Sequence, residues 1–434
     1  MKKTFFSYVL GCRVNEAEKE MFDLRLIEAG FSQNEINPFF CIINSCAVTN
    51  KAERETRQLI YQLKRKFPQA KIVLTGCSAT YWKKLDLGRD LPIDLLVDNL
   101  NKKYLVKFIV RRLLHQPSFD RGGQKQLGQI TYPISKFLKS GRAIIKIQDG
   151  CHRFCSYCIV PYLRGTQKSY LIKDIIDKIN SLTDIQEVIL TAINTEAFGY
   201  DTDENLSQLI DLVINKASIS RISFGSIHPL SIDQNFLNFY RKILNKHRLV
   251  NFFHIPLQSG CDKTLKLMKR GYTAKEFAWK IKEIKKINPY ALVATDVIVG
   301  FLDESDKDFE DSCRFLKTNP IDKFHVFRFS NRDKTAAYHM RKRLSEASSE
   351  VKAKRAKALA ALSQKKYQQF LQFLVDNKYR SKALFIDKFE DGHQQALLDN
   401  QVPVWVKTSK IQPGFIKRLS LTKFENNKLI AEIH

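Results

Sequence analysis

The chemistry marked most clearly in this sequence lies in a run of three cysteines, Cys151-His-Arg-Phe-Cys155-Ser-Tyr-Cys158. Thiolates at these spacings can fold around an iron–sulfur cubane, bind three of its irons and leave the fourth iron open for a substrate or cofactor. A structural zinc site needs a fourth protein ligand, and His152 is too close along the chain to be an obvious one. We therefore predict a [4Fe-4S] cluster on these three cysteines.

Three more cysteines, Cys12, Cys46 and Cys77, are far apart in the sequence but are predicted to share a second site. Each follows the end of a stretch that is predicted to be a parallel strand. The carboxyl ends of parallel strands share one edge of an open sheet, and ligands bind at that edge. Position, more than spacing, therefore predicts a second cluster held by three cysteines.

The segment that carries these scattered cysteines, residues 1–100, alternates apolar stretches with polar ones. In the polar stretches the apolar residues recur at helical spacing, which predicts helices between the strands. This pattern is typical of an open parallel α/β sheet. Strands are expected at residues 5–10, 39–44, 72–75 and 95–97, and helices at residues 15–29 and 50–66.

The run from Cys151 to Cys158 follows the first of six strands expected within residues 143–330. Six βα units are too few for a closed eight-stranded barrel, so we predict an open or partial barrel with its active face at the carboxyl ends of the strands. His228 and His254 lie at such ends, and satisfying buried backbone groups is the alternative role for each. The strands are expected at residues 143–147, 188–191, 222–225, 252–255, 293–299 and 324–329.

The last part of the chain differs in texture. A basic helix is expected at residues 341–370, and short β-like runs after it predict a small antiparallel barrel of the oligonucleotide-binding kind. Between residues 101 and 142, basic residues outnumber acids strongly, which indicates an exposed linker. The predicted division is an N-terminal domain at 1–118, a basic linker at 119–142, a barrel with the basic helix at 143–368 and a C-terminal domain at 369–434.

The string IKIQDGCHRFCSYCIVPYLRG, residues 145–165, resembles the radical S-adenosylmethionine (radical SAM) methylthiotransferases. The segments around Cys12, Cys46 and Cys77 resemble the N-terminal domain of this family, and residues 369–434 weakly resemble its RNA-binding TRAM domain. The resemblance implies that S-adenosylmethionine binds the open iron of the barrel cluster and that one-electron reduction releases a 5′-deoxyadenosyl radical. It also implies a second [4Fe-4S] cluster that carries the transferred sulfur. The implied S-adenosylmethionine contacts are Asn194, Ser226, Gln258 and Asp296.

Two positions depart from the family pattern. Ala192 stands where the family has glycine, and Leu302-Asp303 replaces a Pro-Gly pair. Neither change touches a predicted cluster ligand, although both lie near the expected S-adenosylmethionine pocket.

The charge balance points to a polyanionic partner. The chain has 72 Lys and Arg against 45 Asp and Glu, a formal net charge of +27, and nucleic acid is the first candidate for such a surplus. Within the family, Leu-Gly-Cys-Arg-Val-Asn at residues 10–15 resembles the enzymes that modify threonylcarbamoyladenosine beside the tRNA anticodon. Isopentenyladenosine in tRNA, an aspartate of a ribosomal protein, and a non-catalytic iron–sulfur RNA-binding protein remain alternatives. A protein reductant and a sulfur donor are expected as further partners.

The number of cysteines and the N-terminal segment indicate the cellular compartment in which the protein is expected. Nine cysteines in a long chain do not form the dense disulfide framework of a small secreted fold. Cys41 lies in an apolar run and is predicted to be a core residue, while Cys261 and Cys313 lack cysteine partners at motif spacing. The short apolar stretch after Lys3 is at the lower limit for an export signal, and no apolar run reaches the length of a membrane span. We expect a cytoplasmic protein without a membrane segment.

Overall fold

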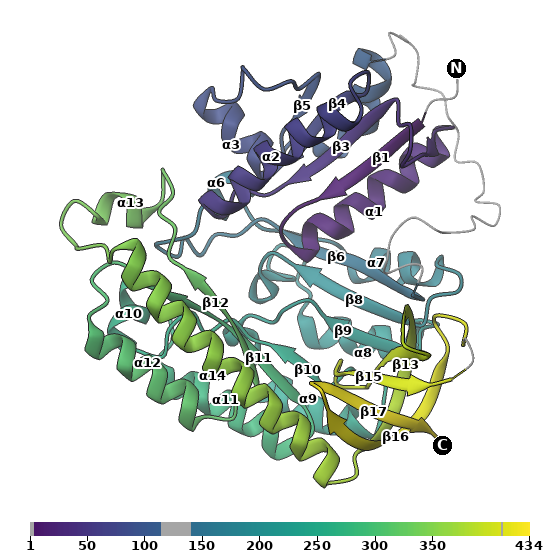
Figure 1. Cartoon of the computed structure of the whole chain (residues 1–434), viewed down its shortest axis with the longest axis vertical. Helices are drawn as coiled ribbons and strands as arrows, with labels where there is room; N and C mark the ends of the chain where they lie inside the picture. Colours follow the sequence, from purple (N-terminus) through teal and green to yellow (C-terminus); the bar gives the residue numbers. More distant parts are fainter. Residues whose placement is uncertain (1–3, 114–139, 409–410) are drawn as a thin grey trace.

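The N-terminal part is a parallel sheet of five strands covered by helices (Figure 1). The computed structural model describes residues 4–113, 140–408 and 411–434. The strand order is β2-β1-β3-β4-β5, and every neighbouring pair is parallel. The strands are β1 (Thr4–Val9), β2 (Ser32–Gln33), β3 (Phe40–Ser45), β4 (Lys71–Gly76) and β5 (Leu95–Val97), and the main helices are α1 (Arg13–Glu28), α2 (Asn50–Lys66) and α3 (Cys77–Leu85). The predicted open α/β sheet is confirmed.

The central strand β3 is buried along its whole length. A parallel strand covered on both faces reads as a continuous apolar run rather than an alternating one, which is what Phe40-Cys-Ile-Ile43 provides. Cys41 is fully buried there, as expected for a core residue. Helix α2 begins where the Thr49 side chain accepts a hydrogen bond from the amide of Ala52 at 3.1 Å, a standard N-cap.

Six parallel strands form the predicted partial barrel: β6 (Arg142–Asp149), β8 (Glu187–Ala192), β9 (Arg221–Phe224), β10 (Phe252–His254), β11 (Leu292–Val299) and β12 (Lys323–Arg328). They form two sheets, which are joined by backbone hydrogen bonds from β9 to the segment before β10 and from the loop after β9 to β10. The Ile222 amide donates to Arg248 O at 2.7 Å, and the Ile227 amide donates to His254 O at 2.8 Å. A short strand β7 (Lys168–Ser169) pairs antiparallel with β6.

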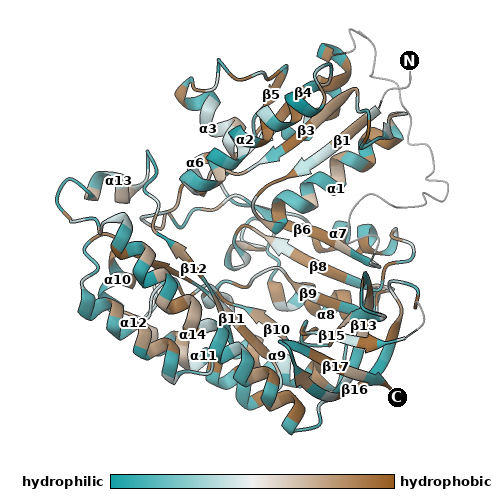
Figure 2. Ribbon diagram, in the orientation of Figure 1, coloured by the Kyte–Doolittle hydropathy of each residue, from teal (hydrophilic) through white to brown (hydrophobic). Residues whose placement is uncertain are grey.

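Helices cover the outside of this barrel, and their apolar faces join one large core with the strands. Figure 2 shows hydrophobic residues along the strands and hydrophilic residues on the outward sides of the helices. The helices of this core are α7 (Ile172–Asn180), α8 (Leu206–Lys216), α9 (Gln234–Ile243), α10 (Asp262–Leu267), α11 (Ala274–Ile287) and α12 (Asp306–Thr318). By contrast, α6 (Val160–Arg164) packs in the N-terminal core, and α13 (Ala336–Met340) packs in a small separate cluster. In the described part of the chain, no helix combines the length and apolarity needed to cross a bilayer.

The long basic helix differs from its prediction in bounds and in exposure. Helix α14 spans Ser349–Asp376, so residues 341–348 lie before it. Lys352 and Arg355 are buried and do not present their charge to solvent. Lys352 Nζ lies 2.5 Å from Glu346 Oε1, and Arg355 Nη1 lies 2.7 Å from Glu304 Oε2. Because buried charges require partners, Arg355 holds the helix on the barrel through Glu304, whereas the Lys352–Glu346 pair joins the helix to the segment just before it.

The C-terminal strands close into a small barrel in the order β13-β14-β15-β17-β16. One pair, β15 with β17, is parallel rather than antiparallel because β16 intervenes in the sequence and turns the chain. The strands are β13 (Arg380–Glu390), β14 (His393–Leu397), β15 (Pro403–Lys407), β16 (Ile416–Glu425) and β17 (Lys428–Ile433).

The small barrel packs at the amino ends of β8 and β9, where Arg221 donates to Leu397 O and Leu398 O at 2.9 Å each. The C-terminal barrel therefore lies at the opposite end of these strands from the loop that carries Cys151. Most of the predicted linker at 119–142 lies outside the described residues.

Candidate active site

The three N-terminal cysteines follow three adjacent strands of the first sheet. Cys12 is the N-cap residue of α1, just beyond β1. Cys46 follows β3 directly, and Cys77 is the first residue of α3, directly after β4. The strand order β1-β3-β4 places the three turns side by side at one edge, as the sequence predicts.

Two glycines allow the turns to approach one another closely. Gly11 has φ +95°, and a Cβ added there would lie 2.8 Å from the Sγ of Cys46. Gly76 has φ +94°, and a Cβ added there would lie 2.4 Å from Ser45 O. Side chains at these two positions would be strained and would also clash. The glycines before Cys12 and Cys77 thus allow the three cysteine loops to pack together.

Hydrogen bonds fix the loops in this arrangement. Asn15 Nδ2 donates to Leu10 O at 2.8 Å and to Ser45 O at 3.0 Å, which joins the Cys12 turn to the end of β3. Ser78 Oγ donates to Cys46 O at 2.6 Å, which joins the Cys46 turn to α3. Asn99 Nδ2 points at the Cys77 sulfur at 3.7 Å.

The thiols of this set are close enough to affect one another's ionisation. Burial raises the pKa of the Cys46 thiol to about 12, and the neighbouring Cys77 and Cys12 thiols add to the increase, while Arg164 opposes it. No three His, Cys, Asp or Glu side chains of the described residues are disposed to hold one metal ion. Three converging thiols of this kind fit a polynuclear cluster, whose irons each bind one thiolate.

The second set occupies the loop between β6 and α6. The Cys151 amide donates to Gly165 O at 3.1 Å, and the Cys158 amide donates to Cys155 O at 2.9 Å, so the loop curls back on itself. Burial raises the pKa of the Cys158 thiol to about 12, and the Cys155 and Cys151 thiols add to it. The three sulfurs therefore lie close together at the carboxyl end of the first barrel strand.

Two arginines that the sequence analysis did not single out support this loop. Arg270 Nη1 lies 3.4 Å from the Cys155 sulfur, where it can donate a hydrogen bond to a thiolate. Arg153, within the loop, pairs with Glu196 just after β8 at 2.6 Å. The loop is thus tied to the barrel by charged pairs as well as by backbone hydrogen bonds.

Of the four predicted S-adenosylmethionine contacts, Asn194, Ser226 and Gln258 follow the carboxyl ends of barrel strands, and Asp296 lies within β11. Gln258 and Asp296 are adjacent, because the Gln258 amide donates to Asp296 O at 2.8 Å. Gln258 has φ 77°, an uncommon backbone conformation for a residue with a side chain. The Asn194 side chain accepts from the Glu196 amide at 3.2 Å. Ser226 is half-buried in the loop after β9.

The two histidines at these strand ends differ in their partners. His254 Nε2 lies 2.9 Å from Asp296 Oδ1. His228 Nδ1 accepts from the Leu230 amide at 3.3 Å, which is the backbone role considered for it. Burial and then Arg270 lower the pKa of His228 to about 2, so its ring is neutral. Its Nε2 is buried without a hydrogen-bond partner among the described residues.

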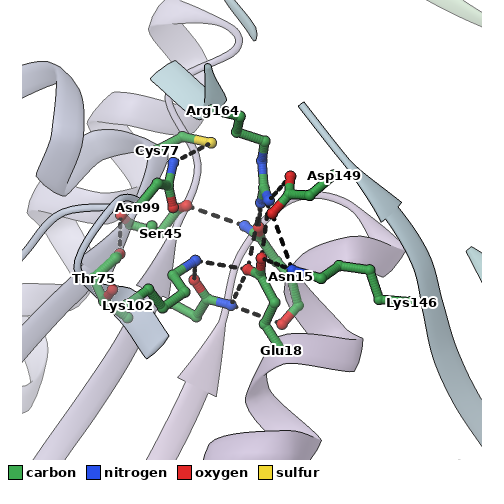
Figure 3. Close-up of polar contacts among 12 residues, drawn as sticks. Asn15, Glu18, Ser45, Thr75, Cys77, Asn99, Lys102, Lys146, Asp149 and Arg164 are labelled. Atoms are coloured by element: carbon green, nitrogen blue, oxygen red, sulfur yellow. Dashed lines mark hydrogen bonds and ion pairs between the residues drawn. The ribbon is translucent and has the colours of Figure 1, made fainter. Parts of the chain in front are cut away.

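A buried network of charges lies beside Asn15 and Cys77 of the N-terminal site (Figure 3). Glu18 of α1 accepts from Arg164 Nη1 at 2.9 Å, from Lys102 Nζ at 2.6 Å and from Lys146 Nζ at 3.0 Å. Arg164 Nη1 also donates to Asp149 Oδ1 at 2.9 Å. No sequence pattern predicts this network, although Arg164 lies within the string at residues 145–165.

The departures from the family pattern leave the local backbone intact. Asp303 adopts φ 59°, the left-handed conformation that glycine takes most readily. Beside it, the Gly300 amide donates to Glu304 Oε2 at 2.6 Å, so the Glu304 side chain holds the turn after β11. Ala192 is a buried residue at the end of β8.

A groove of about 890 Å³ opens beside the N-terminal cysteines, between the first turn of α2 and the segment after β12. Thr49, three positions after Cys46, is one of its lining residues. Phe327 and Tyr338 line it and are exposed large aromatic side chains. The basic residues that line it are Lys51, Arg54, Arg328, Arg341 and Lys352, and the acidic ones are Glu55, Asp333 and Glu346.

Comparisons with known proteins agree with this arrangement. Residues 145–316 match the radical SAM superfamily, and residues 4–98 match the uncharacterized protein family UPF0004. The threonylcarbamoyladenosine tRNA methylthiotransferase MtaB of Aquifex aeolicus is 32% identical over 84% of this chain and 88% of its own. The protein of the same name from Chlamydia pneumoniae is 36% identical over 78% of this chain and 77% of its own.

A relative named for a different nucleoside matches over nearly the full length. The tRNA-2-methylthio-N(6)-dimethylallyladenosine synthase of Petrotoga mobilis is 32% identical over 99% of this chain and 98% of its own. Both kinds of relative are methylthiotransferases, and the matched radical SAM region contains the run from Cys151 to Cys158. The chain therefore belongs to the family of radical SAM methylthiotransferases.

Proposed function

We propose that this chain is a tRNA methylthiotransferase that converts N6-threonylcarbamoyladenosine beside the anticodon to its 2-methylthio derivative. The observation that carries the proposal is the pairing of two separate sets of three thiols at the junction of the N-terminal sheet and the barrel. The names of the relatives from Aquifex aeolicus and Chlamydia pneumoniae favour this nucleoside. The relative from Petrotoga mobilis supports isopentenyladenosine as the second candidate.

Membership of the radical SAM superfamily implies a [4Fe-4S] cluster and S-adenosylmethionine. In our proposal, Cys151, Cys155 and Cys158 hold this cluster, and Cys12, Cys46 and Cys77 hold a second one. When bound, the first cluster and S-adenosylmethionine supply a carbon-centred radical after one-electron reduction, and the second cluster supplies the sulfur. Asn194, Ser226, Gln258 and Asp296 are the proposed S-adenosylmethionine contacts.

The roles of the supporting residues follow from their contacts. Arg270 can donate to the Cys155 sulfur, and such hydrogen bonds adjust the reduction potential of a cluster. His254 is held by Asp296, so its ring orientation is set before any ligand binds. The neutral ring of His228 carries its hydrogen on Nε2, since Nδ1 accepts a backbone hydrogen bond. The Nε2–H of His228 can donate a hydrogen bond to a ligand that contacts this side chain.

The proposed RNA surface is the groove that lies between the first turn of α2 and the segment after β12. Exposed Phe327 and Tyr338 suit stacking with unpaired bases, and Arg54, Arg328 and Arg341 suit phosphate contacts. The net charge of +27 supports a polyanionic substrate over a protein one. Because the reaction consumes electrons and sulfur, the proposal includes a protein reductant and a sulfur donor as partners. It also includes a cytoplasmic location, where the tRNA substrate is found. The proposal includes the division of the chain into an N-terminal domain at 1–118, a linker at 119–142, a barrel with the basic helix at 143–368 and a C-terminal domain at 369–434.

The test is a direct assay of product nucleosides. Anaerobically reconstituted enzyme, a reductant and S-adenosylmethionine are incubated with tRNA carrying threonylcarbamoyladenosine, with tRNA carrying isopentenyladenosine, or with ribosomal proteins, and digests are analysed by mass spectrometry. The expected result is a 2-methylthio product from the first tRNA alone. A product only from isopentenyladenosine would refute the substrate while keeping the enzyme class. A product only from a ribosomal protein would refute RNA modification altogether. Formation of 5′-deoxyadenosine distinguishes an enzyme from a non-catalytic iron–sulfur protein.

A further inference from the structure

We propose that Arg164 is the counter-ion of the Cys12–Cys46–Cys77 site and that it raises the reduction potential of the cluster bound there. This inference deepens the proposed function and depends on it, because it assumes the second cluster. Arg164 is the last residue of α6, six positions after Cys158, so it follows the first barrel strand in the sequence, while the apolar residues of α6 pack in the N-terminal core.

The guanidinium of Arg164 reaches into the N-terminal site. Its side chain is only 1% exposed. Nη2 donates to Asn15 Oδ1 at 2.7 Å, and the Asn15 side chain itself joins the Cys12 turn to the end of β3. In Figure 3 the guanidinium extends between Asp149 and the group formed by Asn15 and Glu18. One side chain of the barrel thus contacts the framework that holds Cys12 and Cys46.

The charged groups of the network leave one surplus positive charge beside the N-terminal site. Three cations, Arg164, Lys102 and Lys146, surround two carboxylates, Glu18 and Asp149, so one positive charge is not neutralised inside the network. A buried charge of this kind requires a partner of opposite sign. Three thiolates around a doubly positive cubane carry one net negative charge and would match it.

The electrostatics of the thiols indicate where this surplus acts. Although burial opposes its charge, Glu18 and then the Cys77 thiol hold the pKa of Arg164 well above its usual value, with a further contribution from Cys12. Arg164 also opposes the increase in the pKa of Cys46. By contrast, the charged groups that act on Cys151 are Arg153 and Glu196, without Arg164 among the leading ones. Arg164 therefore lies against the framework of the N-terminal set, through its hydrogen bond to Asn15, although it is close in sequence to Cys158.

A purely structural role, joining the two domains, is the competing explanation, and charge-changing variants separate the two. The parent is the full chain with Cys151, Cys155 and Cys158 replaced by alanine, which leaves only the N-terminal site. In this parent, Arg164→Met removes one positive charge and Glu18→Gln removes one negative charge. Both variants break the same buried network, so a structural role predicts that they behave alike.

Arg221→Met is the matched control. Arg221 is also a buried arginine at a domain boundary, and it pairs with the buried Glu187 at 3.1 Å. It lies at the amino ends of the barrel strands, away from all six proposed ligands. The readouts are bound iron and sulfide after anaerobic reconstitution and the reduction potential of the N-terminal cluster, measured by electron paramagnetic resonance during a redox titration.

The expected result is a shift to lower potential in Arg164→Met, a shift to higher potential in Glu18→Gln and no shift in Arg221→Met. Shifts of the same sign in the first two variants, or shifts no larger than the control's, would overturn the proposal. If Arg164→Met binds no iron, Glu18→Gln decides: a raised potential supports the proposal, and an unchanged one overturns it. A parent that binds no iron refutes the second cluster, and with it both proposals, whereas a loaded parent with unshifted variants refutes the role of Arg164 alone.

Discussion

Substituting Cys46 and Cys41 separately should distinguish a cluster ligand from a core cysteine on the same strand. Cys41 lies within β3 and Cys46 directly follows it, and both are buried. Cys46 approaches the Cys12 and Cys77 turns, whereas Cys41 packs with Ile43, Ile60 and Ile72 in the core. In each case alanine removes one buried sulfur, which costs about 1 kcal/mol of folding free energy through lost packing.

The effect on iron should differ sharply between the two variants. Two clusters contain about eight irons per chain, and a cluster with three protein ligands is not expected to survive the loss of one, so Cys46→Ala should retain about four. Cys41→Ala should retain about eight. The Cys46 carbonyl still accepts from Ser78 in the variant, because that bond uses only the backbone of residue 46. The loss of iron should therefore not be accompanied by collapse of the turn.

Iron and acid-labile sulfide are measured after anaerobic reconstitution, together with 5′-deoxyadenosine and the methylthio nucleoside. Cys46→Ala should still cleave S-adenosylmethionine, because the Cys151 loop has its own three ligands, but it should make no methylthio product. Cys12→Ala and Cys77→Ala should behave like Cys46→Ala. Wild-type iron in all three variants would show that the N-terminal cysteines are structural. Loss of all iron from Cys46→Ala would show instead that the two sites are not independent.

Three further outcomes are expected. Cys155→Ala should abolish S-adenosylmethionine cleavage, since it removes one of three anchors of the barrel cluster, and full 5′-deoxyadenosine formation by the reconstituted variant would contradict that assignment. Phe327→Ala should weaken tRNA binding by roughly 5- to 150-fold in a filter-binding assay, the range for loss of about 1–3 kcal/mol of base stacking. The control Trp279→Ala, which removes a similarly exposed aromatic side chain from α11, should leave tRNA binding unchanged. Equal effects of the two substitutions would show that the RNA does not bind at Phe327. His228 has its pKa lowered to about 2 by burial, so the unfolded chain takes up a proton below about pH 6.5 that the folded chain does not, and this costs about 2 kcal/mol of stability by pH 5. Urea unfolding of the iron-free protein at pH 7 and pH 5 should show a smaller acid loss in His228→Gln than in the wild type, and identical losses would refute the buried neutral ring.

Much of the fold follows from local patterning. Helix α2 begins and ends at the predicted residues because a threonine cap precedes it and apolar residues recur at helical spacing. The barrel strands were located within one or two residues, since buried parallel strands are continuous apolar runs. Helix α14 begins and ends later than the helix predicted at residues 341–370. Its start depends on the N-cap residue Ser348, whose side chain accepts a hydrogen bond from the Val351 amide at 3.3 Å. The basic composition of residues 341–370 also concealed that Lys352 and Arg355 are buried against acids, Glu346 just before the helix and Glu304 after β11.

The run from Cys151 to Cys158 could be interpreted from the sequence alone because its three thiols share one short loop, and any backbone that forms the loop brings them together. The convergence of Cys12, Cys46 and Cys77 depended on the strand order and on the close packing that Gly11 and Gly76 allow.

The network around Arg164 was beyond sequence reasoning altogether, since Arg164 and Glu18 lie 146 positions apart. Polarity and periodicity record which residues prefer water and which element they occupy. They do not record which buried charge meets which, because that depends on how two separately folded sheets dock.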